Sequence, residues 1–193
     1  DASGVSISLR EFFGAPTVAE FAPLLRDGRG RSSELPLQPR TANAELPPLS
    51  WSQQRLWFLD QLEPDNAAYN LHWAARLHGA IDASSLEKAL QDLVARHESL
   101  RTSIQDYGGE PVQIIAASAP LPLQQIALPG AGADALDARL LELVRRPFDL
   151  RVAPLARAWL VTLGPSDSVL LLSVHHIVAD GWSLGVVVDE LSE

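Results

Sequence analysis

The sequence of 193 residues has no cysteine, which excludes disulfide bonds, zinc–thiolate sites and cysteine nucleophiles. It also lacks an apolar run near the roughly 20 residues of a membrane-spanning helix, and residues 1–10 lack the basic-then-apolar pattern of a signal peptide. Basic side chains are few, with 15 against 24 acidic ones and a formal charge of −9. This charge balance argues against a protein that binds nucleic acid or anionic membrane surfaces. We expect a soluble, cytoplasmic protein.

The chain is 47% hydrophobic, enough for a sizeable core, but its parts differ. Residues 28–47 are rich in Gly, Arg and Pro without apolar periodicity, which predicts a linker. Residues 1–27 are too short for their own core, although Thr17 and Glu20 have capping-box spacing before an apolar helical face. Residues 48–193 form the larger part. The chain opens without an initiator Met and stops within a helical pattern, so we expect both ends to be cut.

The larger part alternates helical and strand patterns, which predicts an α/β fold with a mixed sheet. The strand at 168–174 is almost continuously apolar, and we expect it to be buried on both faces. Asp82 and Ser84 are both plausible N-caps for the helix that follows them. The predicted helices cover 52–62, 82 or 84 to 97, 135–145 and 184–191; the predicted strands cover 69–77, 101–104, 111–115, 155–163 and 168–174.

Chemistry-bearing side chains are concentrated after this buried strand, in the segment HHIVADGWS from His175 to Ser183. Neighbouring strand residues point to opposite faces, so one histidine can face the interior and the other a cleft. An imidazole with a pKa near 6.5 can act as a base at neutral pH. Asp180 can accept from a histidine, pair with an arginine or cap the next helix. A metal site is disfavoured because adjacent histidines diverge; two satisfied core histidines are the plainer alternative.

Three segments in order resemble the condensation domains of nonribosomal peptide synthetases, relatives of chloramphenicol acetyltransferase. The segment His175–Ser183 resembles the signature HHxxxDG. The segment SWSQQRLWFL at 50–59 resembles SxAQxRLWxL, with Ser52 in place of Ala. The segment RHESLRTSI at 96–104 resembles RHExLRTxF, with Ile104 in place of Phe. The resemblance covers residues 48–193 and implies the N-terminal subdomain of a chloramphenicol-acetyltransferase-like two-layer sandwich.

The segment FFGAPTVAEF at 12–21 resembles the closing stretch of a peptidyl carrier domain. We therefore interpret residues 1–27 as the C-terminal remnant of such a domain. The serine that carries phosphopantetheine would lie upstream of this chain.

The condensation-domain resemblance implies amide-bond formation between a donor acyl or peptidyl thioester and an acceptor aminoacyl thioester, both carrier-bound. His176 would be the catalytic histidine. Arg101 is the first candidate for an ion-pair partner of Asp180, followed by Arg55 and Arg96. Supporting or structural roles are implied for His175, Asp180, Gly181 and Arg101, and a place in the substrate channel for Trp182 and Ser183.

The resemblance also implies partners. Donor and acceptor peptidyl carrier domains would deliver substrates on 4'-phosphopantetheine arms, with no cofactor or metal bound by this chain. The C-terminal half of the condensation domain would supply the other tunnel wall, beside an adjacent adenylation domain. The isolated chain should then be inactive. The alternatives are an epimerisation domain of the same superfamily and a non-catalytic carrier-interaction module.

Overall fold

A computed structural model describes residues 13–26 and 46–192. The described residues belong to two units, within 1–44 and 45–193, and each unit is described by itself. Most of the predicted linker at 28–47 lies outside the described residues, as do 1–12 and 27 of the predicted carrier remnant.

The described part of the first unit contains helix α2 (Val18–Arg26). The carboxylate of Glu20 accepts hydrogen bonds from the Thr17 backbone N–H at 3.2 Å and from the Thr17 hydroxyl at 2.8 Å. The Glu20 N–H donates back to the Thr17 Oγ1 at 3.4 Å. The predicted capping box is therefore confirmed, and it satisfies backbone donors that the first turn of a helix leaves unpaired.

The second unit follows the predicted alternation of helices and strands. The sequence pattern did not predict the 3₁₀ helix η1 (Glu98–Arg101) or strand β4 (Leu123–Ala127). β4 was missed because Gln124 and Gln125 interrupt its apolar alternation and Pro120 and Pro122 precede it. In chain order the elements are α3 (Trp51–Leu62), β1 (Asn70–His78), α4 (Ala83–Arg96), the 3₁₀ helix η1 (Glu98–Arg101), β2 (Thr102–Tyr107), β3 (Glu110–Ile115), β4 (Leu123–Ala127), α5 (Ala133–Val144), β5 (Ala156–Gly164), β6 (Asp167–His175) and α6 (Gly181–Leu191).

The main sheet has the strand order β1-β6-β5-β4. β6 pairs antiparallel with both β1 and β5, whereas β4 runs parallel to β5, so the sheet is mixed as predicted. β2 and β3 form a separate antiparallel pair. Gly108 and Gly109 in their turn have φ angles of 70° and 95°, a left-handed conformation that glycine adopts without steric cost.

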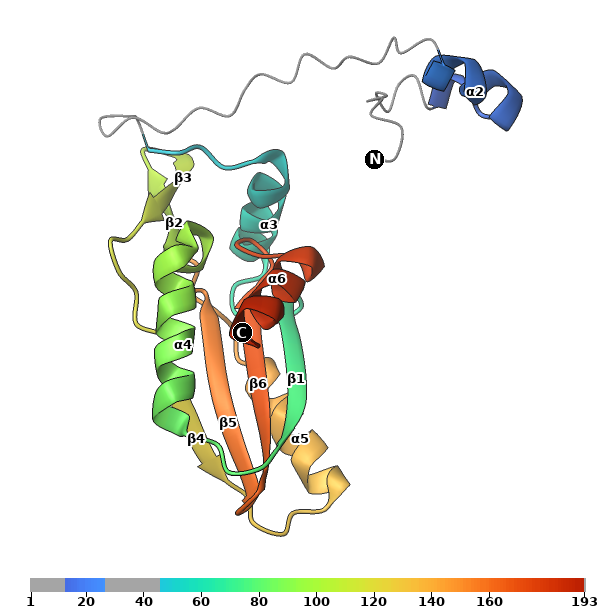
Figure 1. The fold of residues 1–193 in the computed structure, drawn as a ribbon. Coiled ribbons are helices and arrows are strands. Elements are labelled where there is room, and N and C mark those ends of the chain that lie inside the picture. Colours follow the sequence, from blue (N-terminus) through green and yellow to red (C-terminus); the bar gives the residue numbers. More distant parts are fainter. Residues whose placement is uncertain (1–12, 27–45, 193) are drawn as a thin grey trace. The chain divides into compact units, whose positions relative to one another are not determined.

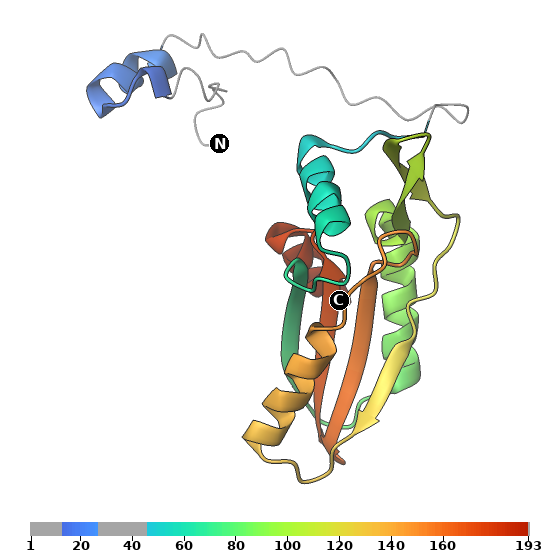
Figure 2. The ribbon, with the colours of Figure 1, turned by 180° about the vertical axis from the view of Figure 1, so that it is seen from behind.

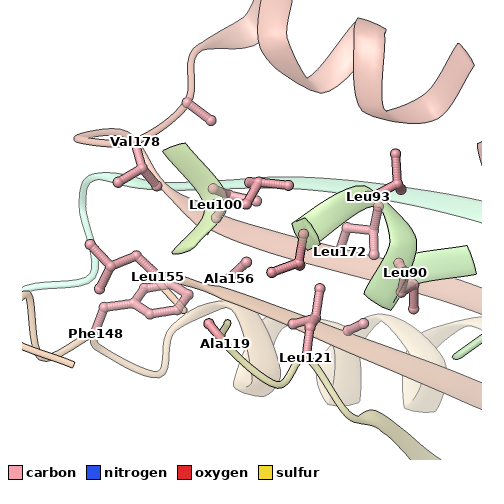
Figure 3. Close-up of a cluster of buried hydrophobic side chains, with 14 of the residues drawn as sticks. Leu90, Leu93, Leu100, Ala119, Leu121, Phe148, Leu155, Ala156, Leu172 and Val178 are labelled. Atoms are coloured by element: carbon pink, nitrogen blue, oxygen red, sulfur yellow. The ribbon is translucent and has the colours of Figure 1, made fainter. Parts of the chain in front are cut away.

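Both faces of the main sheet are covered by helices. Figures 1 and 2 show α4 and α6 on one face and α5 on the other. Alternate residues of β6 serve the two sides: Leu172 belongs to the same cluster as Leu93 of α4 (Figure 3), whereas Leu171 packs with Leu143 of α5 and Trp159. The α/β prediction and the burial of this strand on both faces are confirmed, and the strand ends inside the core.

The N-terminus of α4 is capped by Asp82, whose carboxylate accepts from the Ser84 backbone N–H at 3.0 Å and from the Ser84 hydroxyl at 2.6 Å. Of the two predicted N-caps, Asp82 is therefore the one used. Glu87 instead accepts from the Leu123 N–H at 3.1 Å, so it holds the first residue of β4 against α4.

Candidate active site

The two adjacent histidines lie at the end of β6, and backbone hydrogen bonds fix both. The His175 N–H donates to the Leu155 carbonyl at 2.9 Å, and the His176 N–H donates to the Tyr69 carbonyl at 2.8 Å. His175 is only 4% exposed, whereas His176 is exposed. The expected division into one interior and one outward histidine is confirmed, and it follows from strand alternation.

The buried imidazole of His175 is held from two sides. Its Nδ1 accepts from the Ile177 N–H at 3.2 Å. The ring of Phe148 meets it edge-on, with ring centroids 6.2 Å apart and an interplanar angle of 76°. Burial, helped by the nearby His176, lowers the pKa of His175 from 6.5 to about 4. The ring is therefore neutral at neutral pH, which suits an Nδ1 that accepts a hydrogen bond.

A further arginine, which the sequence did not single out, supports Phe148. The Arg157 guanidinium lies over the Phe148 ring, 4.0 Å from its centroid. It donates to the Arg146 carbonyl at 2.7 Å and to the Pro147 carbonyl at 2.6 Å. Burial, with the nearby Arg146, lowers the pKa of Arg157. The signal in the sequence was a lone cation within an apolar strand segment, a position that requires partners.

Asp180 caps helix α6. Its Oδ1 accepts from the Ser183 N–H at 2.8 Å and from the Ser183 hydroxyl at 2.6 Å. These two hydrogen bonds lower the pKa of the Asp180 carboxyl, so it is ionised at neutral pH. Helix capping was one of three roles that the sequence allowed, and it is the role that the structure shows.

The predicted ion pair between Asp180 and Arg101 is wrong. Arg101 donates through one nitrogen to the Ala116 carbonyl at 2.5 Å and approaches the Glu98 carboxylate at 3.4 Å through another. Arg96, a further candidate, pairs with Glu190 at 3.5 Å. Arg101 ends a 3₁₀ turn, and its guanidinium is directed to the Glu98 carboxylate of that turn and to the Ala116 carbonyl after β3 instead of to Asp180. Its buried Nε has no hydrogen-bond partner among the described residues.

Gly181 and Trp182 begin α6 beside this cap. A Cβ built on Gly181 would meet no atom within 4 Å, so nothing among the described residues crowds this glycine. Trp182 is 84% exposed and therefore does not pack into the described core.

His176 lines an open groove of about 400 Å³. One wall is the start of α3, which contributes Gln53 and Leu56, and the other is the loop after β6 together with Ser183. The Gln53 side-chain amide crosses between them and donates to the Ile177 carbonyl at 3.1 Å. Two motifs that lie far apart in the sequence therefore meet at one exposed imidazole. The groove is lined by Ser50, Ser52, Gln53, Leu56, His176–Asp180 and Ser183.

The described residues hold no group of three His, Cys, Asp or Glu side chains placed to bind a metal ion. Over the same residues, no helix is long and apolar enough to cross a membrane.

A family model for the condensation domain matches residues 43–193. The chain belongs to the condensation domain family. It is 42% identical to one of the linear gramicidin synthase proteins of Brevibacillus parabrevis, over 100% of this chain and 3% of that protein. It is also 42% identical to the dimodular nonribosomal peptide synthase of Bacillus subtilis, over 94% of this chain and 7% of that protein. The chain thus spans a small part of these relatives.

Solved condensation domains share the fold. The first condensation domain of the calcium-dependent antibiotic synthetase matches with a TM-score of 0.71 and 27% identity, over 78% of this chain and 37% of that one. The X-domain of teicoplanin biosynthesis, solved in complex with OxyB, matches with a TM-score of 0.72 and 34% identity, over 81% of this chain and 34% of the other. This partial coverage is consistent with the N-terminal subdomain of a condensation domain.

Proposed function

We propose that this chain is the histidine-bearing N-terminal part of a condensation domain that joins two carrier-bound substrates through an amide bond. The observation that carries the proposal is the position of His176: its imidazole is exposed at the groove, whereas its backbone is held by Tyr69 and its neighbour His175 is buried. A fixed backbone with a free ring is what a reacting base or hydrogen-bond partner requires.

In the proposed reaction the acceptor amine nitrogen bonds to the donor thioester carbonyl carbon. The carbon–sulfur bond breaks, and the donor carrier leaves as a thiol that takes up the proton released by the amine. His176 either accepts this proton or orients the amine through a hydrogen bond. General-base assistance of this kind contributes about 10²–10⁴-fold, and holding amine and thioester together can contribute as much.

His175 and Asp180 support the site in this proposal. His175 packs beneath the loop as a neutral ring and accepts the Ile177 N–H. Asp180 fixes the start of α6 through Ser183, which keeps Trp182 and Ser183 beside the proposed channel. Gly181 is the first residue of α6. Arg101 is not a groove residue, and it supports the backbone after β3 by donating to the Ala116 carbonyl.

The proposed partners are donor and acceptor carrier domains, whose phosphopantetheine arms bring the substrates, the C-terminal half of the condensation domain and an adjacent adenylation domain. Trp51 and Trp182 support the second half as a partner, because they are 87% and 84% exposed and each is next in sequence to a groove residue. Large exposed apolar side chains mark surfaces that a partner covers. We also propose a cytoplasmic location, and residues 1–27 as a carrier remnant.

The test compares the complete condensation domain with its His176→Ala variant, using its own donor and acceptor carriers loaded by their adenylation domains. We expect amide formation, followed by mass spectrometry of the acceptor carrier, to fall by at least about 10²-fold, and His72→Ala on the exposed side of β1 to leave it unchanged. Unchanged amide formation in His176→Ala would overturn the proposal. Amide formation by the 193-residue chain alone would contradict its proposed dependence on the second half.

A non-catalytic interaction module is the second candidate, because the matching X-domain was solved in complex with OxyB. The same assay separates the two: an intact complete domain that binds loaded carriers without forming an amide favours the interaction module. Racemisation of a carrier-bound amino acid in that assay would instead indicate the epimerisation domain.

A further inference from the structure

Gln53 is bonded through every polar atom of its side chain. Its Oε1 accepts from the Ser50 N–H at 2.9 Å, and its backbone N–H donates to the Ser50 Oγ at 3.2 Å, which closes a capping box at the start of α3. Its Nε2 donates to the Ile177 carbonyl at 3.1 Å and to the Gln113 Oε1 at 3.2 Å. One amide thus joins α3, β3 and the loop after β6.

Gln113 is itself held in place on β3. Its side chain donates to the Pro48 carbonyl at 2.9 Å, and its backbone N–H donates to the Pro47 carbonyl at 3.0 Å. Gln53 is therefore supported from the segment before α3 as well as from its own helix. These hydrogen bonds fix the rotamer of the Gln53 side chain, so its amide can hold the Ile177 carbonyl in one position.

The contact with Ile177 acts on the residue that follows His176. The Ile177 N–H donates to the His175 Nδ1 and the Ile177 carbonyl accepts from Gln53, while the His176 N–H is held by Tyr69. Ile177 is 3% exposed, so water does not replace these partners readily. The backbone on both sides of His176 is fixed, and with it the direction in which the imidazole leaves the chain.

We infer that Gln53 is a positioning residue for the condensation reaction: its amide holds the Ile177 carbonyl and so sets the orientation of His176 in the groove. This inference rests on the proposed function of His176. Gln53 does not have to touch either substrate. Its effect passes through the loop, where a displacement of about 1 Å can cost on the order of 10²-fold in rate.

The acceptor role and the donor role of the Gln53 amide can be tested separately by two substitutions. Gln53→Glu keeps an acceptor for the Ser50 N–H, and Ser-x-x-Glu is itself a capping box. Its carboxylate cannot donate, so it faces the Ile177 carbonyl and the Gln113 oxygen without a hydrogen bond. Gln53→Lys does the reverse, because it offers donors to those oxygens and leaves Ser50 without its acceptor.

The experiment measures kcat and KM for the acceptor carrier in the complete condensation domain, together with the melting temperature of each variant. For Gln53→Glu we expect kcat to fall on the order of 10²-fold with KM little changed, and the melting temperature to fall because the Ile177 carbonyl loses its donor. For Gln53→Lys we expect a lower melting temperature and a kcat close to that of the parent. Gln54→Glu is the matched control, since Gln54 donates to the Leu49 carbonyl at 3.2 Å on the same helix turn but not to the loop; its kcat should be unchanged.

A purely structural role would make kcat follow the melting temperature in both variants, and that result would overturn the inference. The same holds if Gln53→Glu folds like the parent and retains its kcat. Should Gln53→Glu fail to fold, Gln53→Lys decides: a loss of kcat as large as that of His176→Ala in a folded Gln53→Lys overturns the inference, and a retained kcat supports it. If His176→Ala retains full activity, the proposed function fails first, which distinguishes the two failures.

Discussion

The buried His175 makes the stability of this chain depend on pH in a way that can be measured. Its pKa falls from 6.5 to about 4 on folding, chiefly because the ring is buried. The unfolded chain therefore binds a proton at His175 at a higher pH than the folded chain, and the free energy of unfolding decreases as the pH drops from about 6.5 toward 4. At about 1.36 kcal/mol per pKa unit, His175 alone removes about 2 kcal/mol between pH 7.5 and pH 5.

The perturbation is His175→Asn, which removes the titrating ring and keeps a side-chain acceptor for the Ile177 N–H. Urea unfolding of the chain is followed by circular dichroism at several pH values. The variant is expected to be less stable than the parent at pH 7.5, and this deficit should shrink by about 2 kcal/mol at pH 5. A constant deficit for His175→Asn would refute the reasoning.

Three further substitutions test individual contacts by urea unfolding at neutral pH. His176→Ala should change the free energy of unfolding by less than about 0.5 kcal/mol, because the ring is exposed; a larger loss would mean that the ring packs. Asp180→Ala should lower the urea midpoint by removing the α6 cap, and Asp180→Asn should recover most of that loss. An Asp180→Asn variant as unstable as Asp180→Ala would instead indicate that Asp180 acts through an ion pair. Arg157→Met should cost about 1.5–3 kcal/mol, because the carbonyls of Arg146 and Pro147 lose a charged donor; a variant as stable as the parent would contradict that role.

Local patterns predicted most elements because they depend on spacing along the chain. The almost continuous apolar run of β6 predicted burial on both faces. The adjacency of the two histidines at the end of a strand predicted one buried and one exposed imidazole. The capping box at Thr17 and Glu20 was predicted from a spacing of three. β4 was missed because its two glutamines and the prolines before it hide the alternation; it is held instead by parallel pairing with β5 and by Glu87.

Such local patterns do not predict which side chains become ion-pair or ring partners when they lie far apart in the sequence. The sequence contains several arginines that could meet Asp180, and the first candidate was wrong because Arg101 donates to the Ala116 carbonyl after β3 and to Glu98 in its own turn. The position of Arg157 over Phe148 was not anticipated at all. A salt-bridge partner is selected by the packing of whole elements, which no local spacing encodes.

The sequence by itself determined most of the elements, the family signatures and the division between the two histidines, because each of these depends on neighbours within a few residues. Only the tertiary structure decided what surrounds His176. It joined Gln53 to Ile177 across 124 residues, made Asp180 a helix cap and left one imidazole at an open groove. The physical reason is that hydrogen-bond partners are chosen after the sheet and helices have packed, when burial makes an unpaired polar group costly.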